Sequence, residues 1–355
     1  MAPAVPEDAQ ARARRLVEEL DPRGDHRVAS ELLAAALGLL RDDPDPLDLK
    51  IAAAAVTEMR EAFAVFAPYR DVPKVTVFGS ARTQPNDPLY DQAERIAGAL
   101  AERGWMVVTG AGPGIMHAAM EGAGRARSIG VAIRLPFEQG ANPVIAGDEK
   151  YVSMKYFFTR KLMLVKESQA FVCLPGGFGT LDETFELLTL TQTGKGLPVP
   201  IVLLDTPEDP FWERVDEMIR SQLVARGLVS EGDTNLYFLA ATVEAACAEI
   251  DRFYSNYHSI RYVGDFLIVR LRHALTDAQI TELNERFGHL VARGRIERSA
   301  PLDIERRHDD YVALPRIRFA FRRHRFADLR ALIDALNGFV VPDASAPEVF
   351  VQDPS

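Results

Sequence analysis

The sequence contains little cysteine and no long apolar run. Only two of its 355 residues are cysteine, Cys173 and Cys247, so the chain can build neither a disulfide framework nor a cysteine-based zinc site. No apolar stretch reaches the roughly 18 residues that a membrane span needs, and the first residues lack the apolar core of a signal peptide. We therefore expect a cytoplasmic protein that does not interact with membranes.

Basic residues are also not in excess. The chain has 41 Lys and Arg against 51 Asp and Glu, a formal net charge of −10. This balance argues against a nucleic-acid-binding surface. The seven histidines are scattered without the spacing of metal ligands, so we expect no metal.

The familiar nucleotide-cofactor motifs are missing as well. A dinucleotide fingerprint needs G-x-G-x-x-G, but the second glycine turn reads GAGPGI, with Ile115 in place of the third glycine. The third expected strand ends in Arg134, Leu135 and Pro136, without an acid for a ribose hydroxyl. The only Gly-Lys pair is followed by glycine, which excludes a Walker loop. We expect no cofactor.

The hydrophobic pattern divides the chain into three parts. Residues 1–70 are rich in Ala, Leu, Glu and Arg and predict helices. Residues 71–257 repeat a strand, a turn and a helix, and we interpret them as one α/β domain. Residues 258–355 predict the order strand, helix, strand, strand, helix, strand, a small ferredoxin-like α+β accessory domain. A regulatory or assembly role for this last part is as well supported as a purely structural one.

Seven apolar segments in the middle part predict strands. They are KVTVFGS, WMVVTG, SIGVAIRLP, KYVSM, QAFVCL, PIVLLD and NLYFLA. Strands that alternate with helices favour an α/β fold with a doubly wound parallel sheet. Ligands of such sheets bind beyond the carboxyl ends of the strands, where three glycine turns fall, at Gly79-Ser80, Gly110 to Gly114 and Gly176 to Thr180.

The last of these turns, in LPGGFGTLDE (residues 174–183), joins a buried strand to a helix. The free amides and the positive dipole end of that helix predict an anion site, above all for phosphate. We expect the phosphate on the amides of Gly177, Gly179 and Thr180, since glycine lets the backbone approach closely.

The pattern P-G-G-x-G-T-x-x-E at residues 175–183 resembles the signature of the Lonely Guy (LOG) family. FGSAR, GAGPGIM and the pair Arg160-Lys161 extend the resemblance over about residues 74 to 225. This resemblance implies a Rossmann-like fold and hydrolysis of the N-glycosidic bond of a nucleoside 5′-monophosphate, AMP or a cytokinin ribotide, to free base and ribose 5-phosphate. The implied partner is that nucleotide, and we expect a homodimer or a higher homo-oligomer.

The predicted site has two catalytic residues, Arg160 and Glu183. The predicted substrate-binding residues are Gly79, Ser80, Gly112, Gly114, Glu138, Met154, Lys161, Gly176, Gly177, Gly179 and Thr180. A carboxylate beside the ribose would stabilise the positive charge of an oxocarbenium-like transition state. Arg160 would compensate charge on the phosphate or on the leaving base.

Other interpretations stay open at this point. Thr180 and Glu183 have the spacing of a capping box that only closes the helix start. We expect Tyr156, Phe157 and Phe158 to be core residues, and Met154 is either core or a contact of the base. A non-catalytic nucleotide-binding or sensing module is the main alternative function. A pyridoxal-dependent lysine decarboxylase has weaker support, because the sequence offers no identifiable Schiff-base lysine.

Overall fold

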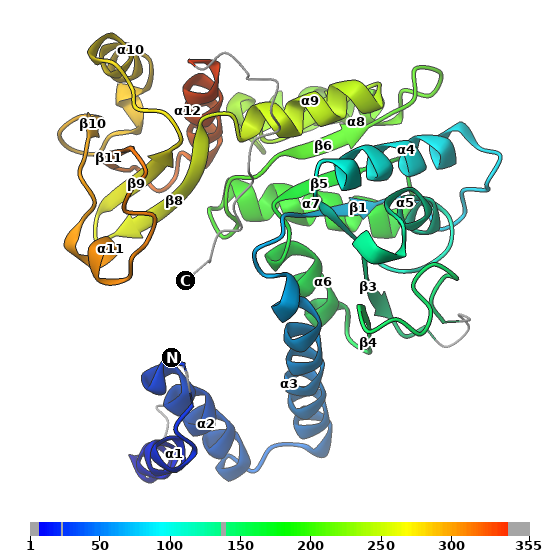
Figure 1. Ribbon diagram of the computed structural model, residues 1–355, viewed down its shortest axis with the longest axis vertical. Helices are drawn as coiled ribbons and strands as arrows, with labels where there is room; N and C mark the ends of the chain where they lie inside the picture. The colour runs from blue at the N-terminus through cyan, green and yellow to red at the C-terminus, as the bar shows by residue number, and fades with distance from the viewer. Residues whose placement is uncertain (1–6, 23, 136–139, 340–355) are drawn as a thin grey trace. The chain divides into compact units, whose positions relative to one another are not determined.

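The structure is a computed structural model, and it describes residues 7–22, 24–135 and 140–339. Packing divides the chain into two compact units, residues 1–59 and residues 60–355. Figure 1 shows the helices and strands of both units.

Three helices account for the N-terminal residues. They are α1 (Glu7–Leu20), α2 (His26–Arg41) and α3 (Pro46–Phe66), the last of which continues into the second unit. α1 packs on α2, and the buried residues of these helices are mostly small, namely Ala9, Ala13, Val17, Ala34 and Gly38. Asp25 caps α2, because its carboxylate accepts hydrogen bonds from two backbone amides of the first turn. The predicted helices are confirmed.

Seven parallel strands form the central sheet of the second unit. They are β1 (Lys74–Phe78), β2 (Met106–Thr109), β3 (Ser128–Ile133), β4 (Tyr151–Met154), β5 (Ala170–Cys173), β6 (Ile201–Leu204) and β7 (Phe238–Ala240). Their order across the sheet is β4-β3-β2-β1-β5-β6-β7. β1, β2, β5 and β6 are buried at every position, which explains their nearly continuous apolar sequences. All seven lie in segments that the sequence predicts as strands, and the Rossmann-like α/β fold is confirmed.

Helices cover both faces of this sheet (Figure 1). One layer contains α4 (Pro88–Glu102), α5 (Ile115–Ala123) and α9 (Val243–Phe253), and the other contains α6 (Phe157–Lys166), α7 (Phe178–Gln192), α8 (Phe211–Met218) and the end of α3. Shorter helical turns are found at Ala67–Tyr69, Arg125–Arg127, Ile219–Val224, Glu231–Leu236 and Gly288–Leu290. β1 contributes to both layers, since Val75 and Val77 pack on the first and Phe78 packs on the second.

The strand order reverses between β1 and β5. The chain builds β2, β3 and β4 on one side of β1, and β5, β6 and β7 on the other. The loops that follow β1 and β5 are joined by a hydrogen bond in which the Ser80 amide donates to the carbonyl of Pro175 at 3.2 Å. The Ile115 amide, at the start of α5, donates to the carbonyl of Ser80 at 3.0 Å. All three glycine turns therefore gather at the point where doubly wound sheets bind ligands.

The C-terminal part forms a second, four-stranded antiparallel sheet. Its elements are β8 (Tyr257–Val263), β9 (Phe266–Leu271), α10 (Asp277–Phe287), β10 (Glu297–Arg298), α11 (Asp303–Arg307), β11 (Arg316–Ala320) and α12 (Phe326–Gly338). The strand order is β10-β11-β9-β8. The prediction of a single first strand is wrong here, because Gly264, with φ of 57°, turns the segment into a β8–β9 hairpin. The predicted last strand, at residues 348–352, lies outside the described residues.

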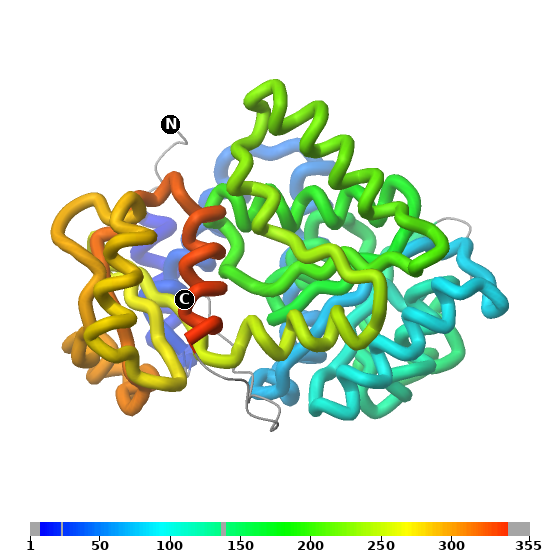
Figure 2. Tube along the Cα trace, turned by 90° about the horizontal axis from the view of Figure 1, so that it is seen from above, coloured from blue at the N-terminus to red at the C-terminus, as the bar shows by residue number. Residues whose placement is uncertain are grey.

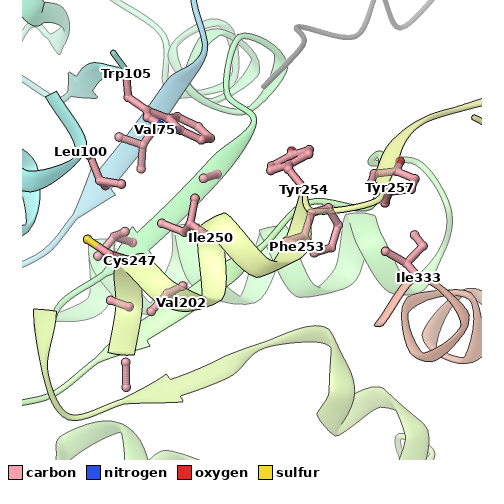
Figure 3. Packing of buried hydrophobic residues seen from close by; sticks show 14 of the residues in the cluster. Val75, Leu100, Trp105, Val202, Cys247, Ile250, Phe253, Tyr254, Tyr257 and Ile333 are labelled. Carbon is pink, nitrogen blue, oxygen red and sulfur yellow. The ribbon is translucent and has the colours of Figure 1, made fainter. Parts of the chain in front are cut away.

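One apolar core connects the two sheets. Figure 3 shows Ile250 and Phe253 of α9, and Tyr254 directly after that helix, leading toward Tyr257 of β8 and Ile333 of α12. The rings of Phe253 and Tyr257 are 5.3 Å apart. α12 also lies beside α7 and α9 (Figure 2). Domain boundaries at residues 70 and 257 stay a prediction, since residues 60–355 pack as one compact unit.

Gly114 provides a test of how the glycine turns hold this edge together. Its φ is +66°, and a Cβ added there would lie 2.3 Å from the carbonyl oxygen of Ser80. Gly124→Ala is the matched control, because its φ is +73° but the added Cβ would meet no atom within 4 Å. The control should cost about 1 to 3 kcal/mol for its positive-φ backbone alone.

Gly114→Ala should lose roughly a further 1 to 3 kcal/mol through the clash. Urea unfolding followed by the fluorescence of Trp105 and Trp212 measures both free energies. Equal losses in the two variants would show that the Ser80 loop does not depend on this contact.

Candidate functional site

A cavity of about 540 Å³ opens at the carboxyl ends of β1 and β5. Residues 77–82 and 177–183 form two of its walls, and Gly110, Met116, Phe157 and Arg160 complete the lining. This volume is in the usual range for sites that bind small molecules.

The first turn of α7 forms one wall with unpaired backbone amides. The helix begins at Phe178, after Gly177 as N-cap, and a glycine has no side chain to cap the amides. The first intrahelical bond runs from the Leu181 amide to the carbonyl of Gly177, at 3.0 Å. The amides of Phe178, Gly179 and Thr180 therefore have no partner within the helix. Together with the helix dipole, they make this wall a site for an anion.

The glycines at this edge have different surroundings. A Cβ would meet Ile115 at Gly79, Met116 at Gly112, Ser80 at Gly114 and Thr180 at Gly176, in each case closer than 3.0 Å. At Gly177 and Gly179 a Cβ would meet no atom within 4 Å. The first four glycines are thus explained by packing of the chain, whereas the last two leave open space beside the amides.

The capping-box interpretation of Thr180 and Glu183 is wrong. The helix begins three residues earlier than a capping box at Thr180 requires, with Gly177 as N-cap, so Thr180 is the third residue of the helix. Glu183 lies a further turn inside the helix and has an exposed side-chain fraction of only 7%. Its Oε2 atom is buried and has no hydrogen-bond partner among the described residues. A buried carboxylate oxygen without a partner costs stability, which indicates a role other than closing the helix.

Two cations of α6 face this carboxylate. Arg160 Nη1 lies 3.7 Å from Glu183 Oε1, and Arg160 Nε donates a hydrogen bond to the carbonyl of Val131 at 3.0 Å. Lys161 Nζ lies 3.7 Å from Glu183 Oε2. Both distances are too long for hydrogen bonds, so the cations act on Glu183 through charge.

Lys161 itself is held by two other carboxylates. Its Nζ lies 2.8 Å from Asp182 Oδ2 and also bonds Glu186. Burial alone would lower the pKa of Lys161, but these bonds outweigh it and raise that pKa. Lys161 does not line the cavity that Glu183 and Arg160 share. Its place is behind Glu183.

Burial raises the pKa of the Glu183 carboxyl above its ordinary value of 4.5. The charges of Lys161 and Arg160 act in the opposite direction and limit this increase, while Asp182 and Glu186 add to it. The carboxyl is therefore balanced between the desolvation of its charge and the attraction of two cations.

The remaining predicted residues lie in varied places. Ser80 lines the cavity, and its hydroxyl accepts a hydrogen bond from the Arg82 amide at 3.1 Å. Met154 is fully buried in the apolar core and does not line the cavity. Glu138 lies outside the described residues.

The expectation that Phe157 and Phe158 are core is wrong, since each exposes 54% of its surface.

The sequence interpretation missed two groups of the cavity wall. Phe178, which is 92% exposed, projects from the first turn of α7. Arg82 follows β1 and lines the same cavity. The signal for Arg82 was its place in FGSAR, directly after a glycine turn.

Within residues 7–22, 24–135 and 140–339, no group of three or more His, Cys, Asp or Glu side chains could hold a metal ion. In the same ranges, no helix has both the length and the apolar character to cross a membrane.

Comparison with known proteins gives consistent matches. A family model described as "Possible lysine decarboxylase" matches residues 114–250. The cytokinin riboside 5′-monophosphate phosphoribohydrolase LOG of Oryza sativa subsp. japonica is 30% identical over 174 residues, 47% of this chain and 68% of that protein. A cytokinin riboside 5′-monophosphate phosphoribohydrolase of Mycobacterium tuberculosis is 32% identical over 125 residues, 33% of this chain and 63% of that protein.

Among solved structures, the Moco carrier protein of Chlamydomonas reinhardtii is 24% identical. The match covers 50% of this chain and 94% of that one, with a TM-score of 0.34.

The balance of charges around Glu183 can be measured directly. Lys161→Met removes a cation that favours the ionised carboxyl, so the pKa of Glu183 should rise further above 4.5. NMR titration of protein labelled at the glutamate carboxyl carbons measures this pKa, and Glu183→Gln assigns the signal.

Lys166→Met is the control, because Lys166 is on the same helix but pairs with Glu167. It should leave the titration of Glu183 unchanged. A wild-type pKa at or below 4.5 would contradict the burial of an unsatisfied carboxylate.

Proposed function

This chain belongs to the Lonely Guy (LOG) family, and on that premise we propose that it hydrolyses the N-glycosidic bond of a nucleoside 5′-monophosphate. The products would be the free base and ribose 5-phosphate, and the substrate AMP or a cytokinin ribotide. One observation carries the proposal. The buried carboxylate of Glu183, whose Oε2 atom has no hydrogen-bond partner among the described residues, lies five residues after the first residue of the uncapped helix α7, in the same cavity.

The 5′-phosphate would bind at the first turn of α7. The amides of Phe178, Gly179 and Thr180 point out of the helix start and can each donate to a phosphate oxygen. The open space beside Gly177 and Gly179 gives a phosphate room to reach these amides. From Gly179 to Glu183 the helix rises about 6 Å, a spacing suited to a ribose ring that extends from its phosphate.

Glu183 would act on the ribose. Cleavage passes through an oxocarbenium-like ribose, and a fixed negative charge beside the ring stabilises the positive charge that develops there. Glu183 is suited to this task because only 7% of its side chain is exposed, so bulk water screens its charge weakly. The charges of Lys161 and Arg160 favour the ionised form of this carboxyl.

In the proposed reaction, a water molecule adds to C1′ as the bond from C1′ to the base nitrogen breaks. The electron pair of that bond leaves with the base, and the proton released by the water balances the charge of the base. Arg160 would hold Glu183 in place and face the leaving group. Lys161 would support Glu183 from behind, without contact with the substrate.

A panel of nucleoside 5′-monophosphates tests the proposal. Each nucleotide is incubated beside its nucleoside, and the free base is measured by chromatography. AMP or a related adenine ribotide should release base, whereas adenosine should release far less, because the helix amides bind the phosphate. Equal turnover of AMP and adenosine would remove the phosphate from the mechanism. Binding of AMP without any release of base would establish the non-catalytic nucleotide-binding alternative.

Glu183→Gln tests the carboxylate itself. The change keeps the size of the side chain but removes its charge, so turnover should fall by about a hundredfold or more, while AMP binding changes little. Glu217→Gln is the matched control, because Glu217 is an exposed glutamate of α8 that does not line the cavity, and this variant should retain most of the activity.

Thermal stability separates a catalytic effect from a structural one. A raised folded-state pKa means that the folded protein binds the proton more tightly than the unfolded chain does. Glu183 therefore lowers the free energy of unfolding as the pH rises from the ordinary pKa of a glutamate through the raised pKa of the folded state. The Tm of Glu183→Gln at neutral pH should be equal to or higher than that of the wild type. Wild-type turnover in this variant would contradict the mechanism.

A further inference from the structure

Four charged residues line the cavity, and three of them have partners. They are Arg82, Arg160, Asp182 and Glu183. Arg160 faces Glu183, and Asp182 pairs with Lys161 at 2.8 Å. Within the part of the chain that the structure describes, Arg82 forms no ion pair, and it is exposed and lines the cavity. The cavity thus presents one uncommitted positive charge.

The backbone holds Arg82 next to the first turn of α7. The Arg82 amide donates to the Ser80 hydroxyl at 3.1 Å, and the Ser80 amide donates to Pro175 at 3.2 Å. The two loops touch, since a Cβ on Gly176 would lie 3.0 Å from the Ser80 nitrogen. Because Gly176 directly precedes the N-cap of α7, Arg82 and the free amides of that helix belong to one end of the cavity.

A nucleotide phosphate needs more positive charge than the helix alone supplies. A phosphate monoester carries a charge of about −1.5 to −2 near neutral pH, whereas a helix N-terminus acts as roughly +0.5. Arg160 is turned toward Glu183 and Val131, and Lys161 is bonded to Asp182 and Glu186. Asp182 and Glu183 also make the neighbouring wall negative, which opposes the entry of an anion.

From this arrangement we propose that Arg82 clamps the 5′-phosphate and is the residue that makes the site select a nucleotide over a nucleoside. The proposal rests on the proposed function, because it places the phosphate at the first turn of α7. A guanidinium can bind two phosphate oxygens at once, while the helix amides bind from the other side. The site would then bind a nucleotide more tightly than a nucleoside, because a nucleoside has no phosphate for Arg82 to bind.

Calorimetric titration of AMP, adenosine and inorganic phosphate tests this assignment. Arg82→Ala should weaken AMP binding about ten- to hundredfold, the scale of losing hydrogen bonds to a charged group, and should raise KM with little change in kcat. Adenosine binding should not change, and Arg82→Lys should restore part of the affinity for AMP. Arg226→Ala is the matched control, because Arg226 is an exposed loop arginine that does not line the cavity.

The outcomes distinguish this inference from the function on which it rests. Unchanged AMP affinity in Arg82→Ala, with wild-type binding intact, overturns the clamp and leaves the hydrolase proposal standing. A wild-type protein that binds neither AMP nor phosphate overturns both. Loss of AMP affinity without any hydrolysis in the wild type supports the clamp and overturns only the catalytic proposal. Equal losses for AMP and adenosine would show that Arg82 does not read the phosphate.

Discussion

The pairing of β1 with β5 determines where the groups of the cavity lie. Their register aligns Val75 with Ala170 and Phe78 with Cys173, so the two strands end at the same level. The amide of Leu174 still donates to the carbonyl of Phe78, at 2.8 Å, and only then do the loops separate from the sheet. The start of α7, the loop of Arg82 and the glycine turn before α5 meet because of this single junction.

At this junction, burial and neighbouring positive charges act on Glu183 in opposite directions. Glu183 is buried deeply enough to raise its pKa, but neither Arg160 nor Lys161 comes close enough to form a hydrogen bond with it. A carboxylate in that state is costly for the fold, and such costs are concentrated at functional sites. In the proposed reaction, the unsatisfied oxygen finds its partner only when positive charge develops on the ribose.

The sequence predicts the repeating parts of the fold better than the site. Continuous apolar runs are enough to locate β1, β2, β5 and β6, since burial on both faces leaves a strong pattern. The edge strands β4 and β7 are partly exposed, and the alternation of strands with helices locates them. The hairpin at Gly264 was missed, because a two-residue turn hardly interrupts an apolar segment. The spacing of Thr180 and Glu183 is the same in a capping box and in this site. Only the residue at which α7 begins shows that Thr180 is not the N-cap. The exposure of Phe157 and the free charge of Arg82 depend on tertiary neighbours, which no local pattern encodes.

A crystal structure of the Glu183→Gln protein with uncleaved AMP would test the central claim most directly. The account predicts that the phosphate lies on the amides of residues 178–180 and that C1′ of the ribose faces the side chain of residue 183. A phosphate bound elsewhere, or a ribose turned away from residue 183, would contradict it.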